Sequence, residues 1–209
     1  QPNFDASEMC FVNNTLAGAV TIAITCTRGA LLSIGNSTFS GIVTVSGGFS
    51  GSSSLLLWGN IGQRFDLSSC PFSTYSLLDV QNNYFTSTGY CFYATASHIN
   101  TYSIHRFVGN TMIATGAVDA VVYVALTSIF KTGSQLIMSN NIIKANAPDD
   151  AVSVHFNGGT IHLDGTNVFN GSLDLNWDAS TSGNIIRLSN HNLHVLRIAV
   201  VGWMSDSII

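Results

Sequence analysis

Charge is scarce in this chain. Only 9% of its 209 residues are charged, and seven Lys and Arg stand against eleven Asp and Glu, for a formal net charge of −4. A domain that binds nucleic acid normally carries a clustered basic patch, whereas the basic residues here are scattered. We therefore expect no nucleic-acid partner.

A long hydrophobic run is also missing. The nearest candidate, AVVYVALTSIF at 120–130, contains Thr and Ser and is shorter than the roughly 20 apolar residues that a membrane-spanning helix needs. We expect no membrane span in this segment. The chain opens on Gln1 and shows no signal peptide, so we expect a processed protein or a segment of a longer one.

No C-x-x-C pair occurs among the four cysteines, which argues against a zinc site or a thioredoxin-like redox motif. They are Cys10, Cys26, Cys70 and Cys91. An even number of cysteines with few lysines favours an oxidising environment, so we expect an extracellular or cell-surface location. Four buried free thiols in a cytosolic protein are the alternative.

What the sequence does contain is a repeat. Segments that resemble LLSIGNSTFSG (31–41) recur along the chain at intervals of 22 to 30 residues. Apolar residues flank one turn position on both sides with a period of two, which predicts strands on either side of a turn. Asparagine occupies that position in seven of eight repeats, with Thr166 in the other: Asn13, Asn36, Asn60, Asn82, Asn110, Asn140 and Asn190.

The repeat resembles the right-handed parallel β-helix of pectate-lyase-like proteins, in which identical residues stack from coil to coil. The resemblance implies an all-β, single-stranded parallel β-helix of about eight coils of 22–30 residues, with an asparagine ladder and one domain over 1–209. Stacked amides both donate and accept, and asparagine tolerates left-handed turns. A β-sandwich or jelly roll is the alternative, although it would not need one residue type at nearly every turn.

The coil register suggests roles for the cysteines. Cys70 lies ten residues after the turn asparagine Asn60, and Cys91 lies nine residues after the turn asparagine Asn82. The two cysteines therefore occupy similar places on consecutive coils, and we expect a disulfide between them. A bridge between Cys10 and Cys26 within one coil is a weaker expectation.

Three N-glycosylation sequons start at Asn13, Asn36 and Asn170. The first two belong to the asparagine column, which we expect to be buried and unglycosylated. Asn170 falls in an outward column and is the expected acceptor.

No convincing catalytic constellation emerges. Asp149 and Asp150 are adjacent and form a weak catalytic alternative, with a solvated loop as the other interpretation, because the N-T-D and G-H-G motifs of polygalacturonases are absent. Pectate-lyase-like sites need several calcium-binding acids and an arginine base, and no cluster of acids matches the repeat positions of Arg64, Arg106 and Arg187. The histidines form no metal-binding motif. We therefore expect no metal and no cofactor.

These patterns favour a non-catalytic structural or adhesive segment of an extracellular or cell-surface protein. Its repeats are similar in texture to the dispersed gene family surface proteins of trypanosomes, a resemblance that implies a surface location and transfers no functional residue. The expected partners are other copies or further coils of the same protein stacked end to end, and glycans or matrix proteins.

The alternative is a carbohydrate-active enzyme or a glycan-binding module. Either would present two carboxylates or an aromatic platform on one parallel face. Trp58 falls in an inward column of the predicted register and is a poor candidate for such a platform. Trp177 and Trp203 lie outside the aligned columns and remain candidates.

Overall fold

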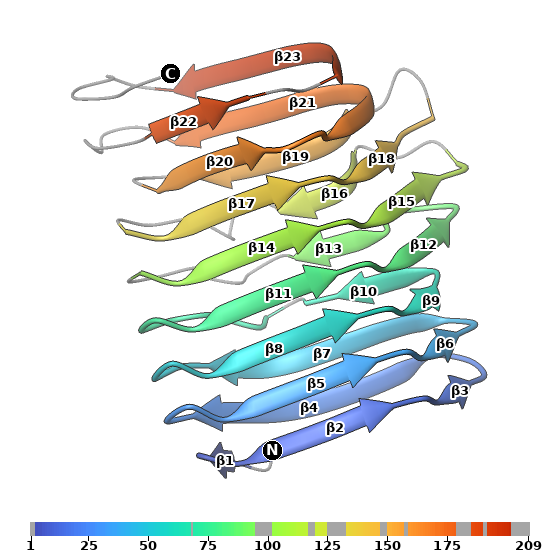
Figure 1. Ribbon diagram of the computed structural model, residues 1–209, viewed down its shortest axis with the longest axis vertical. Helices are drawn as coiled ribbons and strands as arrows, with labels where there is room; N and C mark the ends of the chain where they lie inside the picture. The colour runs from blue at the N-terminus through green and yellow to red at the C-terminus, as the bar shows by residue number, and fades with distance from the viewer. Residues whose placement is uncertain are drawn as a thin grey trace.

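The computed structural model forms a parallel β-solenoid, which confirms the predicted architecture. It describes residues 3–67, 69–94, 102–116, 120–124, 133–146, 150–156, 159–178, 185–189 and 192–201. Within these ranges every strand pair is parallel, and the strands form two sheets. Successive coils stack along one axis, with the amino-terminal strands at one end and β23 (Asn192–Val201) at the other (Figure 1).

Sheet B has eight strands and forms one face of the solenoid. Its register continues without a shift from coil to coil, since Leu55 pairs with both Leu32 and Leu78. Its strands are β2 (Glu8–Val12), β5 (Leu31–Gly35), β8 (Ser54–Trp58), β11 (Leu77–Gln81), β14 (Ile104–Val108), β17 (Gln135–Ser139), β20 (Thr160–Asp164) and β22 (Ile185–Leu188).

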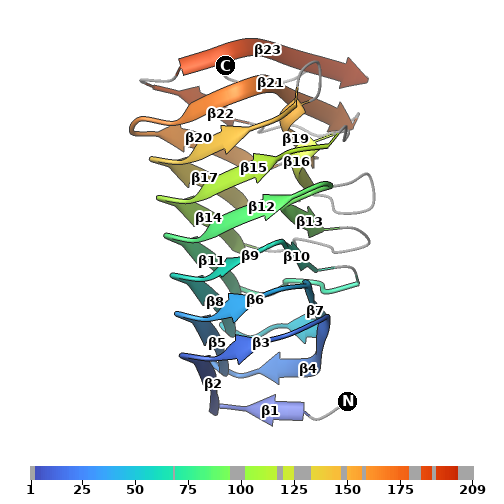
Figure 2. The ribbon, with the colours of Figure 1, turned by 90° about the vertical axis from the view of Figure 1, so that its right-hand side faces the viewer.

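Sheet A has 15 strands in two rows (Figure 2). The row that follows the asparagine turn contains β3 (Thr15–Leu16), β6 (Thr38–Phe39), β9 (Ile61–Gly62), β12 (Tyr84–Ser87), β15 (Thr111–Ala114) and β18 (Ile142–Lys144). The second row contains β1 (Asn3–Asp5), β4 (Val20–Thr27), β7 (Ile42–Phe49), β10 (Arg64–Asp66), β13 (Phe92–Ala94), β16 (Ala120–Val124) and β19 (Asp150–Phe156). The long strand β21 (Val168–Asp178) pairs with β18 and β19 and joins the rows.

The number of coils differs slightly from the predicted eight. Strands β2 to β19 form six successive triplets, each with one strand of sheet B and one from each row of sheet A. In the coil that begins with β20, the last two members merge into β21. About six full turns therefore carry the complete three-strand pattern.

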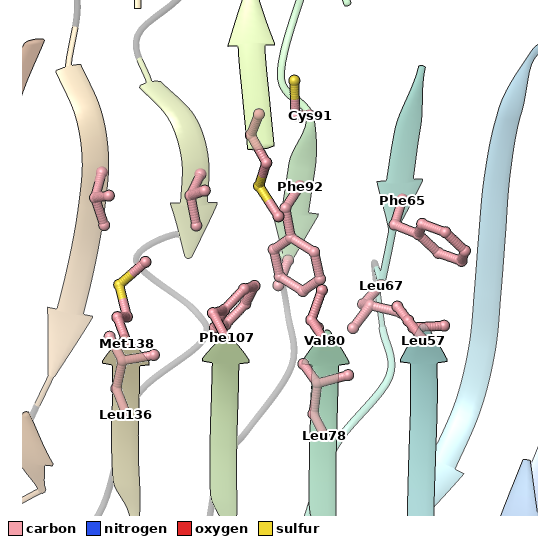
Figure 3. Close-up of a cluster of buried hydrophobic side chains, with 14 of the residues drawn as sticks. Leu57, Phe65, Leu67, Leu78, Val80, Cys91, Phe92, Phe107, Leu136 and Met138 are labelled. Atoms are coloured by element: carbon pink, nitrogen blue, oxygen red, sulfur yellow. The ribbon is translucent and has the colours of Figure 1, made fainter. Parts of the chain in front are cut away.

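The core lies between the two sheets and is lined by the side chains of every second residue along each strand. Leu57, Val80 and Phe107 of sheet B point toward Phe65 and Phe92 of sheet A (Figure 3), and all five are fully buried. The rings of Phe92 and Phe107 meet edge to face with centroids 4.9 Å apart. Each such side chain contributes roughly 1.5–3 kcal/mol by burial, which fixes which face of every strand points inward.

An asparagine ladder runs through the core beside the turn that follows sheet B. From Asn83 onward, each rung accepts hydrogen bonds at Oδ1 from the backbone N–H and side-chain amide of the previous rung, as in Asn60 to Asn83 at 2.9 Å for both. Each side-chain amide also donates to a backbone carbonyl of the previous coil, as in Asn83 to Leu57. The rungs are Asn60, Asn83, Asn110, Asn141 and Asn167.

The predicted ladder positions are correct at Asn60 and Asn110, and wrong by one residue at Asn13, Asn36, Asn82 and Asn140. Ser37 replaces asparagine in the ladder one coil earlier, where its N–H donates to Asn60. Rungs Asn83 and Asn141 stand where Asn82 and Asn140 were predicted, and Asn167 stands next to Thr166. Asn190 lies outside the described residues.

The displaced asparagines occupy a second column, immediately before the ladder. Asn13, Asn36, Asn82 and Asn140 have φ between 45° and 61° and are exposed. Glycine takes this left-handed position in the coils of Asn60 and Asn110, where Gly59 and Gly109 have φ of 62° and 67°. Asparagine and glycine are the residues that tolerate this conformation best. The repeat therefore carries two adjacent columns that both favour asparagine.

A serine column lies at the opposite end of sheet B, just before each strand. Ser53, Ser76, Ser103 and Ser134 are 0–1% exposed, and their stacking follows from hydrogen bonds such as Leu77 N–H to the Ser53 carbonyl. The hydroxyl oxygens of Ser76 and Ser103 lie 3.2 Å apart. Both ends of the sheet B strands are thus tied between coils by small buried polar side chains.

The predicted disulfides are absent: Cys10, Cys26, Cys70 and Cys91 are free thiols. Phe65 pairs with Phe92, which places Cys91 level with Arg64, six residues before Cys70. Counting residues from the turn asparagine gave the wrong alignment because the two coils that contain these cysteines differ in length. Burial raises the pKa of Cys26 to about 11 and those of Cys70 and Cys91 to about 12, so the thiolate forms needed for oxidation are suppressed.

Candidate functional site

The outer face of sheet B carries chemically distinctive side chains around the strands β8, β11 and β14. In a strand, alternate residues point away from the core, and on β11 these are Leu77, Asp79 and Gln81. The register places Leu56 and Arg106 on either side of Asp79, and Trp58 beside Gln81. Aromatic, amide and charged groups therefore share one flat surface.

Asp79 and Arg106 form a two-point ion pair at the centre of this surface. Arg106 Nε donates to Asp79 Oδ1 at 3.0 Å, and Nη2 donates to Oδ2. Gln81 Nε2 donates to the same Oδ2 at 2.6 Å. The Asp79 side chain is 5% exposed, whereas that of Arg106 is 42% exposed. Hydrogen bonding to Asp79 raises the pKa of the Arg106 guanidinium, so this planar, charged group is fixed with one side toward solvent.

Trp58 lies on the outer face of sheet B, which corrects its predicted inward position. Its indole Nε1 donates to Ser33 Oγ at 3.1 Å. The ring covers Gly35, where an added Cβ would lie 2.1 Å from Trp58 Cε2. Glycine is therefore required at that position so that the indole can lie against the neighbouring strand. The error arose because Asn60, a true rung, was aligned with asparagines of the left-handed column, such as Asn36 and Asn82. This shifted the coil of Asn60 by one residue relative to theirs.

Arg64 and Arg106 each have one acidic partner, which is not the cluster of acids that a pectate-lyase-like site needs. Asp79 occupies the position of Arg106 one coil earlier. On the outer face of sheet A, Arg64 Nη2 binds Asp66 Oδ2 at 2.6 Å, and its guanidinium lies 4.5 Å from the ring centroid of Tyr93. The sequence signal for Asp79 and Arg106 was opposite charge at matching positions of adjacent strands. For Arg64 and Asp66 it was opposite charge two residues apart on one face of β10.

The carboxylates on the outer face of sheet B are widely spaced. Glu8 and Asp164 lie on β2 and β20, each three strands from Asp79 on β11. Three strand spacings amount to about 14 Å, beyond the roughly 5–9.5 Å between the paired carboxylates of most glycosidases. Both oxygens of Asp79 are also engaged by Arg106. On this face, the described residues suit binding better than acid–base catalysis.

Only one member of the predicted acidic pair lies within the described residues. Asp149 lies outside the described residues, whereas Asp150 lies 3.4 Å from Nη1 of Arg197. Arg197 is the backbone partner of Asp174 on β21. The outer face of sheet A thus brings Asp150 and Asp174 near one arginine, an arrangement that adjacency in sequence did not suggest.

The histidines have separate environments. His162 lies on the outer face of sheet B, between Ile137 and Arg187 in register, and His191 lies outside the described residues. His105 points inward, and complete burial lowers its pKa to about 3. In the described ranges, no group of three or more His, Cys, Asp or Glu side chains could hold a metal ion.

The sequon asparagines are all exposed. The expectation that Asn13 and Asn36 are buried is wrong, because the buried rung of that coil is the next residue, Ser37. Asn170 lies on β21 opposite Lys144 and is exposed. Glycosylation of Asn170 remains a prediction, and burial no longer distinguishes it from the other two sequons.

Comparisons of the chain with models of protein families, with curated proteins and with solved structures each found no match. In the part of the chain that the structure describes, no helix is long and apolar enough to cross a membrane.

Proposed function

We propose that this chain is a non-catalytic structural and adhesive segment of an extracellular or cell-surface protein, and that the outer face of sheet B is its contact surface for glycans or matrix proteins. The sequons and the texture shared with trypanosome dispersed gene family surface proteins support the location. The cysteines do not, because they are free thiols.

Rigidity supports an adhesive role. The asparagine ladder ties β8, β11, β14 and β17 of sheet B together at the end of these strands, and the Ser76–Ser103 contact links β11 and β14 at their start. A surface whose side chains are held by such a scaffold loses little conformational entropy when it binds a partner. A solenoid also extends the same face over many coils, which suits repeated weak contacts.

The single observation that carries the proposal is the group formed by Trp58, Gln81, Asp79 and Arg106. An indole ring stacks on the apolar face of a sugar, and planar amide and guanidinium groups bind adjacent hydroxyls in pairs. Trp58 is fixed against Gly35 and Ser33, and Arg106 is fixed by Asp79. These groups are ordered before any ligand arrives.

A direct test measures binding of the purified 209-residue protein to immobilised glycans and to extracellular matrix proteins. Trp58→Ala should weaken binding about tenfold, since loss of one aromatic contact costs roughly 1–1.5 kcal/mol. Ile61→Ala is the matched control, because Ile61 is 55% exposed on the other sheet. Thermal unfolding of each variant shows whether the solenoid is intact. Failure of the wild-type protein to bind any member of either panel would contradict the proposal.

A carbohydrate-active enzyme remains the second candidate because Asp150, Arg197 and Asp174 approach one another on sheet A. Release of reducing ends or of unsaturated products from polysaccharides would favour this candidate, provided that Asp150→Asn abolishes the release. Arg28→Gln serves as the control, since the Arg28–Asp5 ion pair is largely exposed and lies in the first coils.

A further inference from the structure

Two tyrosines form an exposed stack at the turn that precedes sheet B. Tyr75 and Tyr102 are 60% and 54% exposed. Their ring centroids lie 5.3 Å apart with an angle of 8° between the planes. The sequence signal is the tripeptide T-Y-S, which occurs at 74–76 and again at 101–103. Two large, nearly parallel rings therefore stack on each other at the surface rather than in the core.

The backbone at both tyrosines is in the left-handed region, with φ of 63° and 59°. The equivalent turn positions in neighbouring coils are filled by Gly29, Ser52 and Gly133, also at positive φ. A bulky side chain is disfavoured in this conformation. Because Gly and Ser close the same turn elsewhere, the rings are not needed to form it. Strain that the fold does not require points to a functional role.

The two rings have different surroundings. Tyr102 is enclosed by Tyr75 on one side and by Gly133 on the other, where an added Cβ would lie 2.5 Å from its ring. The outer side of Tyr75 is directed toward the coil of Ser52, whose side chain is small and exposed. Tyr102 therefore supports Tyr75 from behind and leaves one face of Tyr75 available.

This platform borders the outer face of sheet B. Tyr75 precedes β11, the strand of Asp79 and Gln81, and Tyr102 precedes β14, the strand of Arg106. Tyr75 lies two residues before β11, and Gln81 at the end of β11 is level with Trp58. The strand between them is about 13 Å long. The Asp79–Arg106 pair lies between them. This spacing matches a short oligosaccharide rather than a single sugar.

We propose that Tyr75, backed by Tyr102, is a stacking platform for a pyranose ring of a neutral oligosaccharide that extends across the outer face of sheet B toward Trp58. The inference rests on the proposed function. Nucleobase stacking would need a basic groove along the backbone, whereas the chain has a net charge of −4 and Arg106 is paired with Asp79. A neutral sugar needs only an aromatic face and hydrogen-bonding neighbours.

The test uses isothermal titration and saturation-transfer NMR of the full chain with cellohexaose, chitohexaose, mannohexaose and xylohexaose as probes. Tyr75→Asn should weaken binding of at least one probe about tenfold, because asparagine keeps the left-handed turn but removes the ring. Tyr84→Asn is the matched control, since Tyr84 is 47% exposed on sheet A. Ser52→Tyr should also weaken binding, because a third ring would cover the open face of Tyr75.

The outcomes separate the two proposals. Loss of binding in Tyr75→Asn and Ser52→Tyr, with Tyr84→Asn unchanged and all melting curves intact, supports the platform. If Trp58→Ala weakens binding of a probe but Tyr75→Asn does not, the contact face stands and the platform is overturned. If none of the four probes binds, or if only proline-rich peptides bind, the platform is overturned while binding to matrix proteins still decides the adhesive role.

Discussion

His105 occupies an inward position that leucine or isoleucine fills in neighbouring strands of sheet B. Its column runs through Leu78 on one side and Leu136 on the other. The ring lies edge-on to Phe72 with centroids 4.8 Å apart. Burial favours the neutral imidazole, since the charged form would lose its hydration.

The buried imidazole predicts a stability loss in acid. Burial lowers the His105 pKa to about 3, whereas an unfolded histidine binds a proton near pH 6.5. The unfolded state therefore binds more protons between these values, and the free energy of unfolding should fall by roughly 1 kcal/mol for each pH unit below about 6.5. Above that pH this group has no effect. Denaturant titrations at several pH values from about 7 to about 4 give the free energy of unfolding as a function of pH. This free energy should fall less steeply with decreasing pH in His105→Leu than in the wild-type protein. An equal slope in both proteins would contradict the assignment.

The thiols provide a second test at this scale. Cys10 is exposed, whereas Cys26, Cys70 and Cys91 are buried. In the native protein one thiol should react with a disulfide reagent, and the other three should react only after unfolding. The hydrogen bond to Glu8 raises the pKa of Cys10. Glu8→Gln should therefore increase the rate at which Cys10 reacts with the disulfide reagent near neutral pH. Rapid reaction of all four native thiols would show that the cysteine burial is wrong.

At the scale of the element, the ladder and the left-handed column should respond differently to substitution. Asn83 receives two hydrogen bonds from Asn60 and donates to Leu57 and Asn110. Asn83→Ala leaves several buried groups unsatisfied and should cost about 3–5 kcal/mol. The control is Asn82→Gly, which replaces the exposed asparagine beside Asn83 with glycine, the residue found at this left-handed position in other coils. It should change the free energy of unfolding by less than about 1 kcal/mol. Urea unfolding gives the loss in free energy of unfolding for both variants. Similar losses would contradict the assignment of Asn83, rather than Asn82, to the buried ladder.

The same pair of columns explains how far the sequence predicted this fold. Strand periodicity and the recurrent asparagine were enough for the parallel solenoid, because both follow from local chemistry. The identity of the buried column was not predictable, since N-N doublets at 13–14, 82–83 and 140–141 satisfy either position. The G-N pairs do not distinguish them either: in those at 59–60 and 109–110 the asparagine is the rung, whereas in the pair at 35–36 Asn36 is in the left-handed column and Ser37 takes the place of the rung.

The binding face was missed for related reasons. A one-residue slip moves every side chain to the opposite face of a strand, and this slip turned Trp58 inward. The Asp79–Arg106 pair depends on the spacing of 27 residues between two ladder rungs, whereas Trp58 and Gln81 depend on the spacing of 23 residues one coil earlier. No fixed repeat length supplies both. Exposure and φ of Tyr75 and Tyr102 are properties of the folded turn.

For the whole molecule, the first coil leaves apolar groups incompletely covered. Phe11 and Leu16 are only partly buried, whereas Ile34 and Phe39, their counterparts one coil later, are 0% and 4% exposed. The β2 edge of sheet B also presents backbone groups that its single neighbour β5 leaves open on one side. Such an edge favours addition of another parallel coil.

We therefore predict that copies of this chain associate end to end through the first coil. Sedimentation velocity should show a concentration-dependent rise in mean mass, and Phe11→Asp should reduce it because a charge would be buried in the contact. Val12→Asp is the matched control, since Val12 lies next to Phe11 on the outer face of the same strand. A single 22.2 kDa species at all concentrations, or equal effects of the two variants, would contradict this contact and leave the lateral binding face as the chain's only proposed interface.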